Sequence, residues 1–263
     1  MLIDAHSHPD RFDLEGDQAL RSALAEITEH QILTVANSLD VPSYWRNQEI
    51  AAACDLVLPA FGVHPWYAPQ YAGRLHELDT LLEGTPLIGE AGLDHHFVED
   101  AAEYPAQEEV LRYQLEAAAD QDKIVTLHTK GAEREVLEVL DRYRLRRVIV
   151  HWYSGPLDVF REMAARGAYF TVGVEVLFSE QTRAIAREIP TGRLLTETDN
   201  PGGPKNYLGR AGTPLLVKQV IQGLAEARGT TAEVVEEEVR RTFLEIAKGD
   251  PRLADAYRRV LAG

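Results

Sequence analysis

The sequence lacks several features that would identify other classes of protein. It has a single cysteine, Cys54, among 263 residues, so no intrachain disulfide can form, which suits a reducing compartment. No apolar run reaches the roughly 18 residues that a membrane-spanning helix needs. The chain starts Met-Leu-Ile-Asp-Ala-His, without the basic and apolar regions of a secretory signal peptide. We therefore expect a cytoplasmic protein with no membrane part.

Positive charge is also scarce. The chain carries 27 lysines and arginines against 42 aspartates and glutamates, for a net charge of −15. A protein that coats nucleic acid in bulk would be basic, so this class is excluded. An acidic enzyme can still handle phosphate groups when bound metal ions supply positive charge locally.

The sequence does contain a repeated unit, a short apolar run followed by a helical pattern. Near-continuous apolar runs of this kind are typical of strands that are buried on both faces. The helical spacing is clear in residues 107–120, where Leu111, Leu115 and Ala118 recur on one face. Eight runs occur, at residues 2–5, 32–36, 56–62, 87–92, 124–127, 148–150, 169–174 and 194–198.

Eight strands that alternate with helices predict an α/β fold, a (β/α)8 TIM barrel over residues 1–263 as a single domain. Extra helices follow at the C-terminus, with one apolar stripe of Val235, Val239, Phe243 and Ile246. The alternative is an open doubly wound sheet, which usually has fewer strands and a glycine-rich first turn. The first turn here is His6-Ser7-His8-Pro9, which favours the barrel.

A TIM barrel places its active site at the C-terminal ends of its strands. Residues two apart in a strand share a face, so His6 and His8 should point the same way, with Asp4 deeper on that face. Other polar residues lie near the ends of the later runs or just after them: His64, Glu90, His128, Lys130, His151 and Asp199. If the barrel is correct, these side chains meet at one end of it.

The residue types at these strand ends are those of a metal site. Neutral imidazole and carboxylate suit zinc, manganese and similar divalent ions. Taken alone, Glu90 could be a salt-bridged core acid and Asp199 a turn residue or helix cap. Together with four histidines they suffice for two ions about 3.5–4 Å apart, an arrangement that supports attack at phosphorus or carbonyl carbon.

In this order the motifs resemble those of the TatD family of metal-dependent deoxyribonucleases, a branch of the amidohydrolase superfamily. The matching stretches are DAHSH at 4–8, GVHP at 62–65, GEAGLD at 89–94, LHTK at 127–130, HWYSG at 151–155 and ETDNP at 197–201. The resemblance implies a barrel that binds two divalent ions and hydrolyses phosphodiester bonds, often from 3′ to 5′ on single-stranded DNA. The implied ligands are His6, His8, Glu90, His128, His151 and Asp199, with Glu90 shared between the ions.

A mechanistic hypothesis assigns the remaining roles. One ion would be held by His6, His8, Asp199 and Glu90, and the second by Glu90, His128 and His151; zinc, magnesium and manganese all remain open. Asp199 and Glu90 are the expected catalytic residues, with Asp199 as general base. His64 and Lys130 are expected to bind the substrate phosphate. Asp4 and Glu197 are expected to orient ligands, and no obligate protein partner is evident.

The chain departs from the family pattern outside the ligands. HWYSG at 151–155 replaces a motif that usually reads like HCFSG, and Lys130 stands where arginine is frequent. Gly212-Thr213-Pro214 occupies the region of an Asn-x-Pro element, and Thr242 replaces an asparagine of the last helix. These changes bear on the choice of substrate more than on metal binding.

Two further features bear on the substrate. Residues 200–225 contain no acidic residue but include Lys205, Arg210 and Lys218, a basic island that could hold a phosphate backbone. Four aromatic residues just past strand ends could stack on bases, although two of the four are expected to pack against the barrel instead: Trp66, Tyr67, Trp152 and Tyr153.

These features favour a nucleic acid as the substrate, whereas the overall negative charge favours a small molecule. The main alternative is therefore an amidohydrolase-type hydrolase of a small carbonyl or phosphoester substrate. An aminoacyl-tRNA ester is an intermediate case. The same barrel and ligands can activate water for each of these, so fold alone does not decide.

Overall fold

The computed structural model describes residues 1–16 and 18–263. The chain divides into two compact units. The first comprises residues 1–36, 46–58 and 170–263, and the second comprises residues 37–45 and 59–169. The single domain over residues 1–263 stays a prediction.

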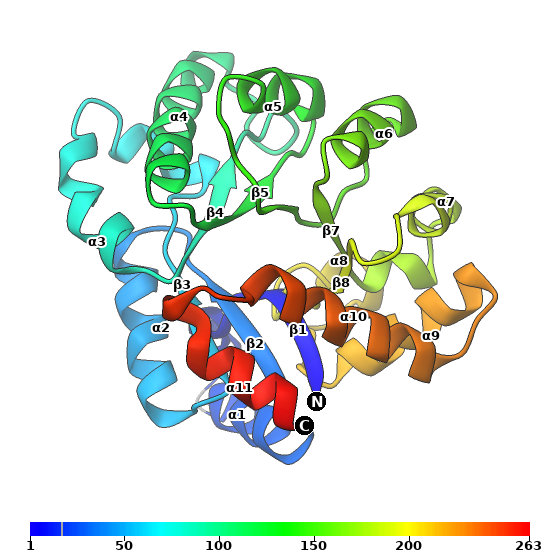
Figure 1. The fold of residues 1–263 in the computed structure, drawn as a ribbon. Helices are drawn as coiled ribbons and strands as arrows, with labels where there is room; N and C mark the ends of the chain where they lie inside the picture. Colours follow the sequence, from blue (N-terminus) through cyan, green and yellow to red (C-terminus); the bar gives the residue numbers. More distant parts are fainter. Residues whose placement is uncertain (17) are drawn as a thin grey trace. The chain divides into compact units, whose positions relative to one another are not determined.

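The first unit contains strands from both ends of the chain (Figure 1). β1 pairs in parallel with β2, with Leu2 opposite Ile32, and β7 pairs in parallel with β8, with Phe170 opposite Leu194. The strands of this unit are β1 (Leu2–Ser7), β2 (Ile32–Asn37), β7 (Tyr169–Val172) and β8 (Leu194–Thr196). Asn37 at the end of β2 and Tyr169 at the start of β7 are assigned to the second unit. Its helices are α1 (Ala19–Glu29), α7 (Glu180–Glu188), α8 (Lys205–Leu208), α9 (Leu216–Arg228), α10 (Ala232–Ala247) and α11 (Ala254–Ala262).

Within this unit the last strand lies beside the first. The Thr196 hydroxyl donates a hydrogen bond to the backbone oxygen of Ile3 at 2.6 Å, and the Asp199 N–H donates to the backbone oxygen of His6 at 3.0 Å. In an open doubly wound sheet the last strand lies at an edge, away from the first. A closed barrel instead requires these two strands to be neighbours, so the adjacency favours the barrel over the open sheet.

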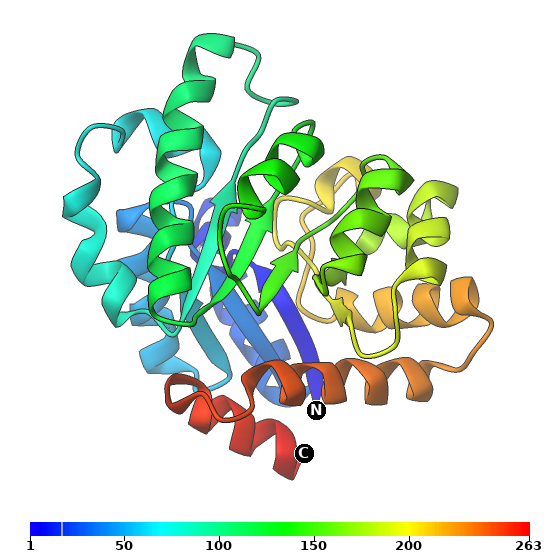
Figure 2. The same cartoon turned by 45° about the horizontal axis from the view of Figure 1, so that its top comes forward.

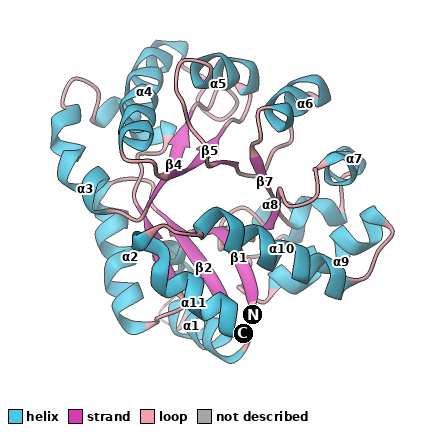
Figure 3. Cartoon of the chain, in the orientation of Figure 1, coloured by secondary structure: helices cyan, strands magenta, loops and turns pink. Residues whose placement is uncertain are grey.

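The second unit contains the middle strands β4 (Leu87–Gly92), β5 (Ile124–His128) and β6 (Val148–Val150). β5 pairs in parallel with β4 on one side and with β6 on the other. Figure 3 shows α4 and α5 flanking β4 and β5. The helices of this unit are α3 (Asp79–Gly84), α4 (Tyr104–Asp120), α5 (Glu133–Leu140) and α6 (Leu157–Ala165), while α2 (Val41–Ala53) and β3 (Val57–Ala60) have residues in both units.

Burial confirms that the strands are covered on both faces. Every residue of β1, β2, β4 and β5 is buried, as near-continuous apolar runs predict. Three strands are shorter than the apolar runs that predicted them, at 56–62, 169–174 and 194–198. The chain leaves the last two strands early to form turns, with a 3-10 helix at Val174–Leu177 and a left-handed φ of 51° at Asp199.

The extra C-terminal helices are present as α9, α10 and α11. All four residues of the predicted stripe on α10 are buried, because α10 packs against β1 and β8. Figures 1 and 2 show α10 passing beside the start of β1. Cys54 lies in the core of the first unit with Ile27 and Leu56. Across residues 1–16 and 18–263, no helix combines the length and the apolar character that a membrane crossing requires.

Candidate functional site

The first unit gathers two histidines and an aspartate at the end of β1. His6 lies in β1, and His8 follows it as the cap residue of the next 3-10 helix. The Nε2 atoms of the two rings are 3.2 Å apart, and the rings meet edge to face. Asp199 Oδ1 lies 3.2 Å from His8 Nε2 and 3.7 Å from His6 Nε2. These three side chains therefore present imidazole nitrogen and carboxylate oxygen to one small region.

Asp4 holds the segment that carries Asp199. Its Oδ1 accepts from the Thr198 N–H at 2.9 Å, and its Oδ2 accepts from the Thr198 hydroxyl at 2.5 Å. Complete burial raises the pKa of Asp4 to about 8, even though the bonds from Thr198 act in the opposite direction. Asp4 is thus a positioning residue for the Asp199 turn, and Glu197 in the same turn is also fully buried.

The second unit gathers a carboxylate and two imidazoles at the ends of three neighbouring strands. Glu90 lies in β4 and is 2% exposed, His128 ends β5, and His151 follows β6 directly. Glu90 Oε1 lies 2.7 Å from His128 Nδ1 and 2.8 Å from His151 Nε2. The two imidazole nitrogens are 3.3 Å apart, so both rings converge on the same carboxylate oxygen.

His64 belongs to the same group, although the sequence predicted only a substrate contact for it. Its Nε2 lies 3.5 Å from Glu90 Oε1, and its ring centroid is 4.6 Å from that of His128. One potential ligand atom from each of His64, Glu90 and His128 lies within 4.8 Å of the others. The His64 Nδ1 accepts a hydrogen bond from the Trp66 N–H at 3.2 Å, which leaves Nε2 directed toward the carboxylate.

The donor set in the second unit fits a divalent cation. Burying a carboxylate is costly unless a positive charge compensates it. Burial by itself would lower the pKa of His128, but its contacts with Asp94 and Glu90 outweigh that effect and raise it. These contacts therefore favour positive charge beside the buried acids. Zinc and manganese, which favour imidazole and carboxylate, would supply the same compensation.

Asp94 is a site residue for which the sequence predicted no role. It is fully buried, and its Oδ2 lies 3.0 Å from His128 Nε2 and accepts from the Trp66 indole N–H at 2.7 Å. Its Oδ1 accepts from the N–H groups of His96 at 2.9 Å and Phe97 at 2.7 Å. Burial would raise the pKa of Asp94, but these bonds, chiefly that with His128, hold it well below its usual range. In the sequence, the feature that could have identified Asp94 is its position at the end of the GEAGLD motif.

Replacing Asp94 should weaken metal binding by Glu90, His128 and His151, because Asp94 contacts His128. In Asp94→Asn we expect metal affinity and activity to fall about 10- to 100-fold, because an amide no longer fixes the ring orientation and basicity of His128. Metal titration followed by emission spectrometry of the bound fraction measures the effect. Asp100→Asn, an exposed capping aspartate in the same unit, is the matched control. Unchanged metal affinity in Asp94→Asn would show that Asp94 only packs.

The predicted phosphate-binding lysine and the four aromatic residues have distinct environments. Lys130 is half-buried, and its Nζ donates a hydrogen bond to the Ser154 hydroxyl at 2.7 Å. Within residues 1–16 and 18–263, no acidic side chain forms a salt bridge with Lys130. Tyr153 is buried and donates to the backbone oxygen of Pro156 at 2.7 Å, so it packs. Tyr67 and Trp152 are half-buried, whereas Trp66 is 45% exposed.

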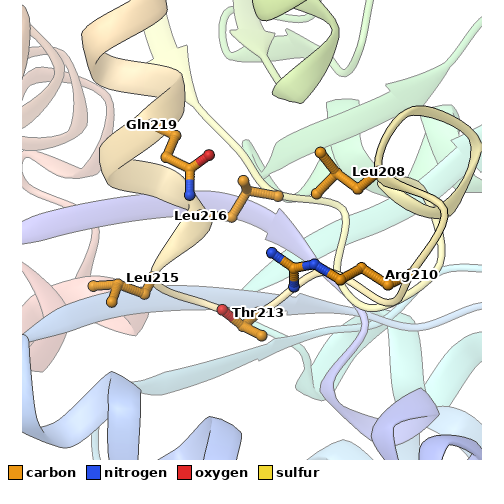
Figure 4. A pocket seen from close by; sticks show the side chains of 6 residues that line it. All are labelled: Leu208, Arg210, Thr213, Leu215, Leu216 and Gln219. Atoms are coloured by element: carbon orange, nitrogen blue, oxygen red, sulfur yellow. The ribbon is translucent and has the colours of Figure 1, made fainter.

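The basic island in residues 200–225 is only partly available to a substrate. Lys205 forms an ion pair with Glu15 at 2.5 Å, and the Lys218 Nζ lies 3.3 Å from His30 Nδ1. Arg210 differs, because its guanidinium points into a pocket of about 220 Å³ (Figure 4). The pocket is lined by Leu208, Arg210, Thr213, Leu215, Leu216 and Gln219.

Comparison with known sequences gives relatives along nearly the whole chain. Residues 3–248 match the family described as TatD related DNase. A Bacillus subtilis protein described as the uncharacterized metal-dependent hydrolase YabD is 29% identical over 258 residues, which cover 92% of this chain and 99% of the relative. The human deoxyribonuclease TATDN3 is 25% identical over 262 residues, covering 93% and 94%.

Solved structures agree with the predicted fold. The TatD homologue YjjV from Escherichia coli K12 superimposes with a TM-score of 0.84 at 24% identity, covering 93% of this chain and 97% of that one. The phosphotriesterase homology protein from Escherichia coli has a TM-score of 0.64 at 17% identity, covering 90% and 96%. These likenesses confirm the TIM-barrel fold of the amidohydrolases. With the match over residues 3–248, they show that the chain belongs to the TatD family of metal-dependent hydrolases.

Proposed function

We propose that this chain hydrolyses phosphodiester bonds of single-stranded DNA, removing nucleotides from the 3′ end. The observation that carries the proposal is the convergence of His128 and His151 on the buried Glu90 carboxylate, at 2.7 and 2.8 Å. A buried acid among imidazoles is a donor set for divalent ions, and such ions serve phosphodiester hydrolysis. The name of the human relative, a deoxyribonuclease, supports DNA as the substrate.

In this proposal two divalent ions bind. The first is assigned to His6, His8 and Asp199 of the first unit, and the second to Glu90, His128 and His151 of the second unit. The sharing of Glu90 between both ions is part of the proposal and rests on the family resemblance. When bound, the ions supply Lewis acidity, which lowers the pKa of the attacking water and neutralises charge on the phosphate. Zinc, magnesium and manganese are all compatible with these ligands.

The side chains of the protein perform the remaining steps. Asp199 accepts the proton of the attacking water as the oxygen–phosphorus bond forms. The bond from phosphorus to the 3′ oxygen breaks, and that oxygen takes up the proton. His64 and Lys130 hold non-bridging phosphate oxygens, and the Ser154 contact orients the Lys130 ammonium group.

The test is a gel assay of chelator-stripped protein on single-stranded DNA labelled at its 5′ end. Magnesium, manganese and zinc are added back separately, and Asp199→Ala is the inactive control. We expect no cleavage without metal, and progressive shortening from the 3′ end with at least one metal. The metal that restores cleavage identifies a competent cofactor.

A negative result would be equally informative. If protein with two bound metals per chain, confirmed by elemental analysis, leaves DNA intact, the nuclease proposal is wrong. A small carbonyl or phosphoester compound, or an aminoacyl-tRNA ester, would then be the substrate to test, because the same ligands activate water for those electrophiles. Endonucleolytic fragments would retain the nuclease activity but contradict the direction of digestion.

Location and partners complete the proposal. We place the enzyme in the cytoplasm and assign it no obligate protein partner. The basis for the location is the single cysteine, which suits a reducing compartment. Fractionation of cells that express the tagged chain, followed by gel filtration of the cytoplasmic fraction, tests both points.

A further inference from the structure

Two exposed aromatic rings lie next to the candidate metal ligands of the second unit, because Asp94 contacts both Trp66 and His128. Trp66 is 45% exposed and Phe97 is 55% exposed. Their ring centroids are 6.0 Å apart with an interplanar angle of 85°, so the pair forms a corner of two aromatic faces. Single exposed apolar residues are common, but an adjoining pair beside buried charged residues indicates a binding surface.

The Asp94 carboxylate holds the aromatic pair in place, and it also contacts the candidate metal ligand His128. Asp94 Oδ2 accepts from the Trp66 indole at 2.7 Å and lies 3.0 Å from His128 Nε2. Asp94 Oδ1 accepts from the Phe97 N–H at 2.7 Å. One carboxylate oxygen and one imidazole ring therefore separate the indole from Glu90. A ligand bound at that cluster would have the aromatic corner directly beside it.

The loop that carries Phe97 is fixed on its other side as well. The His95 ring stacks on Tyr104 at a centroid distance of 3.7 Å, and the His95 N–H donates to the backbone oxygen of Lys130 at 3.0 Å. Gly131, at a φ of +71°, allows this close approach, because a Cβ there would lie 3.1 Å from the backbone nitrogen of His96. The aromatic corner is thus preorganised, and it lies beside the lysine assigned to the phosphate.

We propose that Trp66 and Phe97 form a stacking platform for an unpaired nucleobase attached to the phosphate that is cleaved. This inference rests on the proposed phosphodiesterase function and adds a reason for its single-strand preference. Aromatic rings stack on any base without reading its edges, so the platform is tolerant of sequence. A base inside a duplex is already stacked on both faces and cannot use it. Lys130 supplies the positive charge that the adjoining backbone phosphate needs.

Steady-state kinetics on two short single-stranded DNAs tests the platform. One is a tetrathymidylate, and the other has the same backbone with abasic sites at its two 3′-terminal positions. In Phe97→Leu we expect KM for the tetrathymidylate to rise about tenfold, which corresponds to the loss of one stacked base, while kcat stays within about twofold. KM for the abasic strand should not change, and Phe97→Tyr should restore the KM of the unmodified protein.

A second readout does not depend on turnover. Stacking of a base on an indole ring quenches the fluorescence of the indole. Metal-loaded protein should therefore lose tryptophan emission when it binds a phosphorothioate-linked tetrathymidylate. The quenching should be absent in Trp66→Phe and absent with the abasic phosphorothioate strand. Trp45→Leu is the matched control, because Trp45 is 56% exposed on α2 and should leave both KM and quenching unchanged.

The outcomes separate the platform from the enzymatic proposal. If the unmodified protein cleaves both strands with the same KM, the phosphodiesterase proposal stands and the platform is wrong. Equal KM increases for both strands in Phe97→Leu would also overturn it, since they would indicate a general disturbance of the loop. If the unmodified protein cleaves neither strand while loaded with metal, the phosphodiesterase proposal fails, and the platform fails with it.

Discussion

Replacing Glu90 with glutamine is expected to abolish activity and metal binding together while the protein stays folded. Glu90 is 2% exposed, and its Oε1 meets both His128 and His151 within 2.8 Å. Glutamine has nearly the same shape but no charge, so it cannot balance a divalent cation. We expect kcat/KM on single-stranded DNA to fall by at least about a thousandfold, which corresponds to losing several kcal/mol of transition-state stabilisation.

The melting temperature of the metal-free protein should not fall in the same variant. A buried carboxylate carries a desolvation penalty that glutamine lacks, and His128 keeps the Asp94 carboxylate as a partner at 3.0 Å, so removing the Glu90 charge should not destabilise the chain. Elemental analysis of bound metal and a thermal melt of stripped protein measure the two effects. Glu77→Gln, at an exposed position of the same unit, is the control for the substitution type. If Glu90→Gln still bound two metal ions per chain, the role assigned to Glu90 would be excluded.

Asp199→Asn is expected to have the second largest effect, on kcat. The asparagine amide cannot accept a proton, so general-base catalysis is lost, and such a loss costs about 10²- to 10⁴-fold. Asn still offers an oxygen to a metal ion and accommodates the left-handed φ of 51° at this position, so the local fold should persist. We expect KM to change much less than kcat.

The metal content of Asp199→Asn distinguishes the two clusters. Within its own unit Asp199 lies beside His6 and His8, so the ion assigned to Glu90, His128 and His151 should remain bound. Metal per chain should therefore stay at or above about one equivalent, whereas Glu90→Gln should lose that ion. A variant that retains both ions and the full kcat would mean that another group accepts the proton.

The strand pattern was predictable because it depends on local composition. Apolar runs at 87–92 and 148–150 coincide with β4 and β6, since strands buried on both faces require apolar residues at nearly every position. The ends of β3, β7 and β8 were predicted too late. In the eighth run, 194–198, the threonines extend the strand-like pattern, but β8 ends at Thr196 because the turn that carries Asp199 takes the backbone out of the ladder.

The candidate ligands were predictable one by one, but their contacts were not. Strand periodicity and the C-terminal ends of strands pointed to His6, Glu90 and His128. Asp94 was missed, because nothing local distinguishes a buried aspartate that bonds to a histidine 34 residues later from one that caps a turn.

The basic island shows the same limit for surface charges. Its three cations are equivalent in a local reading of the sequence. In the structure Arg210 points into a pocket, whereas Lys205 pairs with Glu15, which lies 190 residues away in the chain. Which cation is available to a substrate therefore depends on an acid that no local pattern connects to it.

The alternation of strands and helices, the chemical type of the site and the membership of the family all follow from the order of residues along the chain. Three other features required the folded chain: Asp94 joins His128 to Trp66, Tyr153 packs, and Trp66 is exposed. The physical reason is that burial and hydrogen-bond partners are set by segments distant in the chain, and a local pattern carries no information about which of them meet.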